Sequence, residues 1–142
     1  MDLGGVLLWY KLRLFILESI CGFDIPLNVC DKGLSIAHRG TIIINSNSRI
    51  GCNCRIHVGV VLGTIPGVPD AAPVIGNDTY IGPGAKLYGN IKIGNGCVVG
   101  ANSVVNKSFT EDNICIAGAP AKIISKMGRS QLEERNRTKK PN

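Results

Sequence analysis

A period of six residues runs through the middle of this chain. Branched aliphatic side chains recur at every sixth position, with one interruption, and these register positions are Ile44, Ile50, Ile56, Leu62, Ile75, Ile81, Leu87, Ile93, Val99 and Val105. A period of six matches neither the period of about 3.6 of a helix nor the period of about two of an isolated strand. It is typical of a solenoid in which each hexad makes a short strand and a corner, and three hexads make a coil.

Glycine follows six of these aliphatic residues directly, at Gly51, Gly63, Gly76, Gly82, Gly94 and Gly100. We expect the aliphatic side chains to point inward and to stack between coils. The glycines are expected at corners that need a positive φ or a tightly packed backbone. Aromatic residues make up only 5% of the chain, which suits a narrow interior. The sequence therefore predicts an all-β solenoid, a parallel β-helix.

The chain divides into three predicted regions. Residues 1–22 are predicted to form an N-terminal amphipathic helix, residues 23–127 the hexapeptide-repeat domain with a loop excursion at 64–73, and residues 128–142 a basic, mobile or weakly helical tail. The apolar run at 3–20 is interrupted by Lys11 and Arg13, so a membrane-spanning helix or a signal peptide fits poorly. The helix is expected to pack on the solenoid or on a neighbouring subunit, with an interfacial membrane helix as the alternative.

Charge and cysteine content narrow the classes of function. The net charge is +6, and basic residues are concentrated in the tail. This tail is interpreted either as a solvated segment or as a segment that attracts a phosphorylated ligand or an anionic membrane. No nucleic-acid-binding motif accompanies the charge. The six cysteines lack the spacing of a zinc site, so we expect free thiols in a reducing cytoplasm and no metal. The location is expected to be cytoplasmic, with contact at the inner membrane face as the alternative through residues 3–20.

Two further segments resemble a known family. The stretch from Gly82 to Gly94, GPGAKLYGNIKIG, and the ending Ala117–Lys122, AGAPAK, are similar to bacterial serine acetyltransferases and to the related O-acetyltransferases of polysaccharide biosynthesis clusters. The resemblance covers roughly residues 22–125. It implies a left-handed coil, acetyl-CoA as the co-substrate, and a homotrimer with sites between neighbouring subunits.

Acetyl transfer to a hydroxyl needs a base, and histidine has a suitable pKa. The chain has two histidines. His38 lies where the resembling family has its catalytic histidine, and Asp24 precedes it by 14 residues, in the position of the family's orienting carboxylate. We therefore predict His38 as the base and Asp24 as its partner. His57 occupies a corner position where the repeat often has Gly, and it is a weaker candidate for substrate binding or catalysis.

The resemblance also implies a donor site and leaves the acceptor open. Carried over by position, the residues that would contact CoA are Gly63, Thr64, Pro83, Ala101 and Lys122. Pro83 departs from the family's Ala and cannot donate a backbone hydrogen bond. The family's serine-binding residues, an Asp before the base and an Arg-His pair, are replaced by Ala37 and by Ala71-Ala72. Because serine needs charged partners, a sugar or polysaccharide precursor is the favoured hydroxyl acceptor and L-serine the alternative.

Three other classes of function are alternatives to acetyl transfer. A trimeric solenoid scaffold without catalysis would leave His38 buried or in bulk solvent, away from any groove. A metal enzyme resembling the γ-carbonic anhydrases would need three histidines across a subunit interface, which the two histidines of each chain fit poorly. A nucleotidyltransferase would add a Gly-rich nucleotide domain before the solenoid, and these residues contain none.

Overall fold

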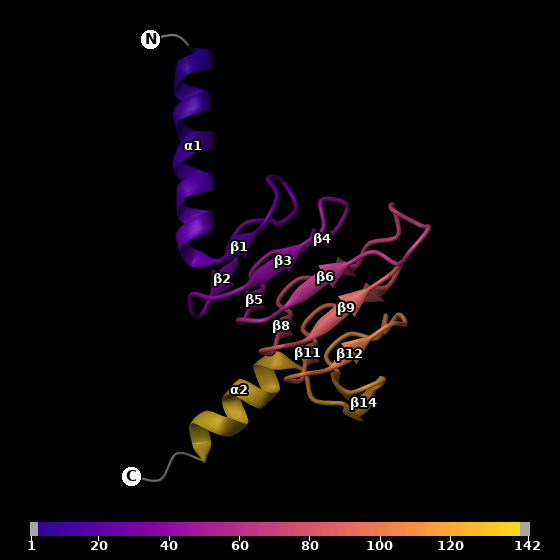
Figure 1. Cartoon of the computed structure of the whole chain (residues 1–142). Helices are drawn as coiled ribbons and strands as arrows, with labels where there is room; N and C mark the ends of the chain where they lie inside the picture. Colours follow the sequence, from indigo (N-terminus) through magenta and orange to yellow (C-terminus); the bar gives the residue numbers. More distant parts are fainter. Residues whose placement is uncertain (1–2, 140–142) are drawn as a thin grey trace.

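The computed structural model describes residues 3–139, which form a β-solenoid with a helix at each end (Figure 1). The helices are α1 (Leu3–Cys21) and α2 (Arg129–Thr138). The strands are β1 (Phe23–Asp24), β2 (Ser35–Ile36), β3 (Ile42–Ile44), β4 (Arg49–Ile50), β5 (Arg55–Ile56), β6 (Val61–Gly63), β7 (Val74–Ile75), β8 (Tyr80–Ile81), β9 (Lys86–Tyr88), β10 (Lys92–Ile93), β11 (Val98–Val99), β12 (Val104–Val105), β13 (Cys115–Gly118) and β14 (Ala121–Ser125).

Three sheets form the faces of the solenoid. Sheet A has the order β1-β3-β6-β9-β12, sheet B the order β4-β7-β10, and sheet C the order β2-β5-β8-β11-β13-β14. All pairings are parallel except that of β13 with β14, which closes the C-terminal end as an antiparallel pair. The chain turns from sheet A to B, from B to C and from C back to A, and we name the three edges the A–B, B–C and C–A corners. The prediction of a parallel β-solenoid is confirmed.

The ten register positions form the core. Their exposed fractions range from 0% to 4%, so every one of these side chains points inward. On sheet C, for example, Ile56 pairs with Ile81 and Ile81 with Val99. Each inward side chain therefore rests on its counterpart in the next coil, and the burial of these stacked aliphatic side chains stabilises the coils against one another.

Five of the six register glycines serve close approach and not unusual backbone angles, and the exception is Gly63, where a Cβ would lie 3.9 Å from the nearest atom. None of the six has a positive φ. Instead, a Cβ placed on Gly76 would lie 2.6 Å from the carbonyl carbon of Gly94, and one on Gly82 would lie 2.8 Å from the amide nitrogen of Ala101. A neighbouring coil thus occupies the space that a side chain would need. Of the two expected reasons for these glycines, the tightly packed backbone is the correct one. The positive φ angles fall at other corner positions, such as Asn53 and Gly84.

A ladder of side-chain amides joins successive coils at the B–C corner. The backbone N–H of Cys52 donates to Oδ1 of Asn77 at 2.8 Å, that of Asn77 to Oδ1 of Asn95 at 2.8 Å, and that of Asn95 to Oδ1 of Asp112 at 2.7 Å. Beside this ladder, the buried thiol of Cys54 donates to the carbonyl of Gly76, 3.2 Å away. The corner amides that strand pairing leaves free are satisfied in this way.

The cysteine thiols are free, and the buried ones have raised pKa values. All six cysteines are unpaired in the described residues. Burial raises the pKa of the Cys54 and Cys97 thiols, and burial with the nearby Cys54 and Asp31 raises that of Cys30 to about 11. Thiols with a raised pKa are poor nucleophiles and poor metal ligands, which agrees with a packing role.

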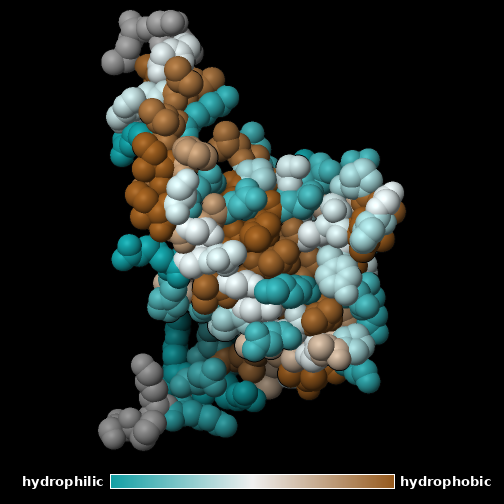
Figure 2. Space-filling model, in the orientation of Figure 1, coloured by the Kyte–Doolittle hydropathy of each residue, from teal (hydrophilic) through white to brown (hydrophobic). Residues whose placement is uncertain are grey.

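Helix α1 differs from the predicted amphipathic helix. Apolar residues fill consecutive positions from Val6 to Tyr10, so they face every side of the helix and not one stripe. The large side chains that are at least 46% exposed are Leu7, Leu8, Trp9, Tyr10, Leu12, Phe15, Ile16, Leu17 and Ile20. Figure 2 shows this apolar surface along the helix, which extends away from the first coil (Figure 1). No helix within residues 3–139 is long and apolar enough to cross a membrane.

The C-terminal segment is more ordered than a weakly structured tail. Helix α2 begins after Gly128, whose N–H donates to Oε1 of Gln131 at 2.8 Å, and Arg129 pairs with Glu133 at 2.9 Å. The guanidinium of Arg129 also donates to the carbonyl of Asn53 at 2.7 Å. These contacts dock the start of α2 on the B–C corner, which explains why this highly charged segment forms a helix.

The amide ladder predicts a measurable loss of stability. Replacing Asn77 by Ala removes the acceptor for the Cys52 N–H, so the free energy of unfolding should fall by about 1 kcal/mol in urea denaturation. The matched control is Asn90→Ala, an exposed corner asparagine whose side chain makes no hydrogen bond within residues 3–139. Equal stability of the two variants would contradict a structural role for the ladder.

Candidate functional site

The C–A corner places both histidines side by side. One row at this corner contains Ala37, His57, Gly82 and Gly100. The backbone N–H of each of these residues donates to a carbonyl in the sheet C strand of the next coil. The length of the turn between this row and the next inward residue differs among the coils. The turn has two residues in the later coils, 58–59, 83–84 and 101–102, and four residues in the first coil, 38–41. His38 opens this longer, exposed turn. It therefore projects from the corner beside His57 and is not buried in the solenoid.

The two imidazoles and a tyrosine form a small aromatic cluster. The ring centroids of His38 and His57 are 6.5 Å apart, and those of His57 and Tyr80 are 4.9 Å apart. Tyr80 lies on β8, directly before an inward isoleucine, so its ring points outward on sheet C. Tyr80 was not predicted as a site residue from the sequence. Its outward direction could have been predicted, because it lies directly next to an inward register residue.

His57 is held neutral near pH 7. Its pKa is lowered from the usual 6.5, first by burial and then by the positive charges of Arg55 and of a protonated His38. Its Nε2 atom is enclosed and has no hydrogen-bond partner in the described residues. An enclosed, unpartnered nitrogen favours the uncharged ring, because the charged form would lose its hydration without compensation.

Three of the predicted donor residues follow the same corner. Pro83 and Ala101 occupy equivalent positions in the two coils after His57, as shown by the 2.9 Å hydrogen bond from the Asn102 N–H to the Pro83 carbonyl. Lys122 lies on β14 in register with Ala117, which stacks on Gly100 in the same corner row. The histidines, the small residues and the exposed lysine are thus arranged in order along one edge of the solenoid.

The other predicted residues lie on the A–B side. Asp24, Gly63 and Thr64 line an open groove of about 400 Å³ together with Asn45 and Ser46. Asp24 pairs with Ile43 on β3, and the turn that begins at His38 leads into that strand. No hydrogen bond or ion pair joins Asp24 to His38 among residues 3–139, so this chain does not show the predicted pair in contact.

The positions that would hold a charged amino acid are apolar. Ala71 and Ala72 are buried, at 7% and 5% exposure, in the excursion between β6 and β7. Asp70 is exposed, and its carboxylate accepts a hydrogen bond from Nδ2 of Asn47 at 3.3 Å. This excursion therefore presents neither of the basic side chains that would bind a carboxylate.

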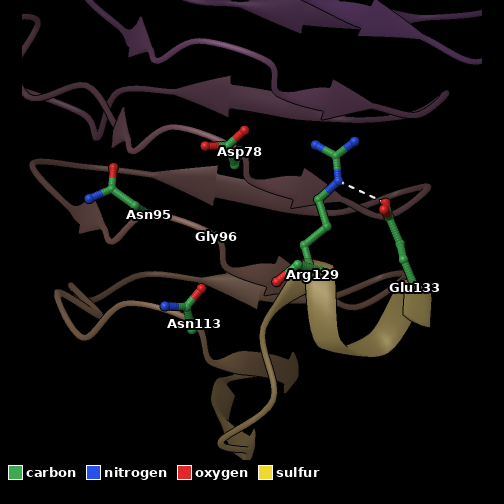
Figure 3. Close-up of a pocket in the computed structure, with 7 residues that line it drawn as sticks. Asp78, Asn95, Gly96, Asn113, Arg129 and Glu133 are labelled. Atoms are coloured by element: carbon green, nitrogen blue, oxygen red, sulfur yellow. Dashed lines mark hydrogen bonds and ion pairs between the residues drawn. The ribbon is translucent and has the colours of Figure 1, made fainter. Parts of the chain in front are cut away.

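A second hollow, of about 360 Å³, lies beneath α2 at the B–C corner and is lined by Asp78, Asn95, Gly96, Asn113, Arg129, Ser130 and Glu133 (Figure 3). Arg129 is already paired with Glu133, as the dashed line in Figure 3 marks. The asparagine side chains belong to the structural corner. Neither histidine lines this hollow. Within residues 3–139, no three His, Cys, Asp or Glu side chains form a group that could hold a metal ion.

Comparisons with known proteins agree with the fold. Residues 72–107 match the family model described as bacterial transferase hexapeptide (six repeats). A serine acetyltransferase of Synechococcus elongatus is 34% identical over 68% of this chain and 40% of its own length. The bifunctional protein GlmU of Francisella tularensis is 33% identical over 72% of this chain and 22% of its own length. The chain thus spans less than half of these curated relatives.

Solved structures give the same result. A serine acetyltransferase from Brucella abortus superposes with a TM-score of 0.70 and 35% identity, covering 79% of this chain and 46% of that one. The same enzyme in complex with coenzyme A gives a TM-score of 0.64 over 70% of this chain and 41% of that one. A soybean serine acetyltransferase complexed with serine gives 0.66, at 31% identity, over 83% of this chain and 52% of that one.

The repeat match and the solenoid define the class: the chain belongs to the hexapeptide-repeat transferases. Within that family it is similar to serine acetyltransferases, and these neighbours imply that the coil is left-handed.

The lowered pKa of His57 predicts a pH-dependent stability. The unfolded chain binds a proton near pH 6.5 and the folded chain only at lower pH, so His57 contributes stability above pH 6.5 that is lost as the pH falls below that value. His57→Phe should reduce the slope of unfolding free energy against pH between about 6.5 and 5. Urea denaturation at several pH values measures this slope, and an unchanged slope would contradict the assignment.

Proposed function

We propose that this chain catalyses acetyl transfer from acetyl-CoA to a hydroxyl group. The observation that carries this proposal is the order of groups along the C–A corner, with exposed His38 at one end, small residues in the middle and Lys122 at the other end. Because the chain is similar to serine acetyltransferases, one of which was solved with coenzyme A, we propose that a long thioester donor lies along this edge with its phosphates near Lys122.

In this mechanism His38 acts as the general base. Its neutral imidazole removes the proton of the acceptor hydroxyl while the oxygen attacks the thioester carbonyl. The tetrahedral intermediate then collapses, the carbon–sulfur bond breaks, and the thiolate of CoA takes up the proton from His38. No covalent enzyme intermediate is needed. Backbone N–H groups at the corner would stabilise the oxyanion, although Pro83 cannot be one of them.

The donor residues divide between two corners. Pro83 and Ala101 would allow the pantetheine arm to lie close to the backbone, and the ammonium of Lys122 would neutralise phosphate charge. Gly63 and Thr64 lie in the A–B groove instead. We propose that the chain forms a homotrimer in which a neighbouring subunit brings an A–B groove to a C–A corner, so that the donor site is completed between subunits.

Asp24 is the proposed orienting carboxylate. It lies in the first coil with His38 but is not bonded to it. Catalytic hydrogen bonds are often long in structures without substrate and shorten when the substrate binds. In the proposed mechanism the carboxylate would accept a hydrogen bond from the imidazole N–H when substrate is bound, which would fix the tautomer of the base.

Two acceptors are supported by different observations. The buried alanines 71–72, together with Ala37, favour a carbohydrate hydroxyl, because a sugar needs no charged partner. The serine acetyltransferases among the relatives favour L-serine at least as strongly by similarity. On the physical argument, we propose a sugar or a polysaccharide precursor as the acceptor and keep L-serine as the second candidate.

The assignment of the base is tested by His38→Ala. Loss of the general base should lower the rate of acetyl transfer by about 10²- to 10⁴-fold while the melting temperature stays the same. The measurement is thiol release from acetyl-CoA by purified protein. Arg39→Ala is the matched control, since it alters the same exposed turn without removing an imidazole. Normal turnover by His38→Ala would exclude this residue as the base.

The choice of acceptor is tested with a panel in the same assay. L-serine is compared with free hexoses and with UDP-linked hexoses, and we expect thiol release with a sugar and little with serine. Turnover with serine alone would show that other groups replace the missing charged residues. Absence of turnover with every acceptor, from a trimer that sedimentation shows to be intact, would favour a non-catalytic scaffold.

A further inference from the structure

His57 occupies a corner position that the next two coils give to glycine and the first coil gives to Ala37. Its counterparts in the next two coils are Gly82 and Gly100. A Cβ on Gly82 would lie 2.8 Å from backbone of the next coil, and one on Gly100 would lie 2.8 Å from the Cβ of Ala117. The corner hydrogen bond is 3.4 Å at Ala37 and 3.2 Å at His57, against 2.8 Å at Gly82 and Gly100, so it is longer in the two coils that have a side chain at this position. A large polar ring at this crowded corner works against tight stacking of the coils.

The surroundings of the ring leave one nitrogen available. Nε2 is enclosed and has no hydrogen-bond partner within residues 3–139, while Nδ1 is not enclosed and also makes no hydrogen bond there. The ring of Tyr80 lies 4.9 Å away and tilted by 51°, so it fixes the plane of the imidazole. The titratable and charged groups that face His57 are Arg55 on β5, Tyr80 on β8 and His38 on the first-coil turn.

We propose that His57 is a specificity-determining residue of the His38 site, whose Nδ1 accepts a hydrogen bond from a second hydroxyl group of the acceptor. This inference rests on the proposed function and adds a substrate class to it, namely an acceptor with at least two neighbouring hydroxyls.

The chemistry of a neutral imidazole leads to this role. One ring nitrogen carries the proton and the other accepts a hydrogen bond. The enclosed Nε2 has no hydrogen-bond donor beside it within residues 3–139, so a bare lone pair there would have nothing to accept. The tautomer with the proton on Nε2 therefore leaves the Nδ1 lone pair toward the surface. A hydroxyl is a donor that matches it.

The distance to His38 makes the role compatible with catalysis. Centroids 6.5 Å apart leave the rings beside each other without overlap, so one hydroxyl can meet His38 while its neighbour on the same molecule meets His57. His38 becomes positively charged when it takes the proton. A second charged imidazole at this distance would oppose that step, and a neutral one does not.

The test compares His57→Phe and Tyr80→Phe with the unaltered full-length protein, using the best sugar acceptor of the panel and its singly deoxygenated analogues. For His57→Phe, the KM for the acceptor should rise by about ten-fold or more, and the KM for acetyl-CoA should stay unchanged. The deoxy analogue that lacks the contacted hydroxyl should show no difference between His57→Phe and the unaltered protein. Tyr80→Phe keeps the ring and removes the hydroxyl, so a rise in the acceptor KM equal to that of His57→Phe would assign the contact to Tyr80 and overturn the role of His57.

Several outcomes would overturn the inference. They are an unchanged acceptor KM in His57→Phe, an equal loss with all deoxy analogues, or turnover with L-serine alone. A matching fall in melting temperature and in activity for both acceptor and donor would show that His57 has only a structural role.

A second readout separates this inference from the proposed function. The chain has two histidines, so nitrogen NMR of the imidazoles resolves His57 directly in ¹⁵N-labelled protein. A change at Nδ1 of His57 on adding the hexoses or UDP-linked hexoses, without any thiol release, would support His57 as a sugar contact and contradict the transferase function. No change with any member of the panel would overturn the role of His57, whatever the turnover.

Discussion

The close stacking of one coil on the next is the constraint on which the rest of this structure depends. Parallel strands lie about 4.8 Å apart, so each corner backbone lies against the corner above it. At Gly76 and Gly94 no side chain would fit, because a Cβ would lie 2.6 Å from atoms of the following coil. In the ladder at the B–C corner, the side chains of Asn77, Asn95 and Asp112 use the short spacing to accept a hydrogen bond from the backbone N–H of the preceding coil. The corner sequence is therefore set by contacts between coils.

The same constraint limits where chemistry can be placed. Inward positions are filled by aliphatic side chains, so functional groups must lie at corners, on the outward face of a strand, or in an excursion. The C–A corner meets this need by adding residues to the first coil, where the turn 38–41 projects His38 into an exposed position. Farther along the corner the turns shorten and Pro83 and Ala101 leave a low surface. A donor molecule lying along this edge would meet small residues first and the base at the end.

Part of this arrangement could be predicted from the sequence. Ten aliphatic residues at a period of six fixed the inward row, because the solenoid allows only one direction for each register side chain. The reason for the register glycines was open, since φ angles and contacts between coils are not visible in one sequence. The extra length of the first C–A turn could not be recognised in the sequence, because residues 38–41 precede the first full repeat. Helix α1 was predicted to be amphipathic from its composition, yet its apolar residues are consecutive and face all sides.

The candidate site shows why residue types alone were insufficient. Asp24 and His38 were paired by resemblance, but the solenoid places Asp24 on sheet A and His38 at the end of sheet C, on different faces of the first coil. His57 was the weaker candidate, because a histidine at a corner can be a solvated side chain. The structure gives it an enclosed nitrogen, an aromatic neighbour and a place where later coils have glycine. A polar ring in this row, with no hydrogen-bond partner among residues 3–139, is best explained by a partner that comes from outside the chain.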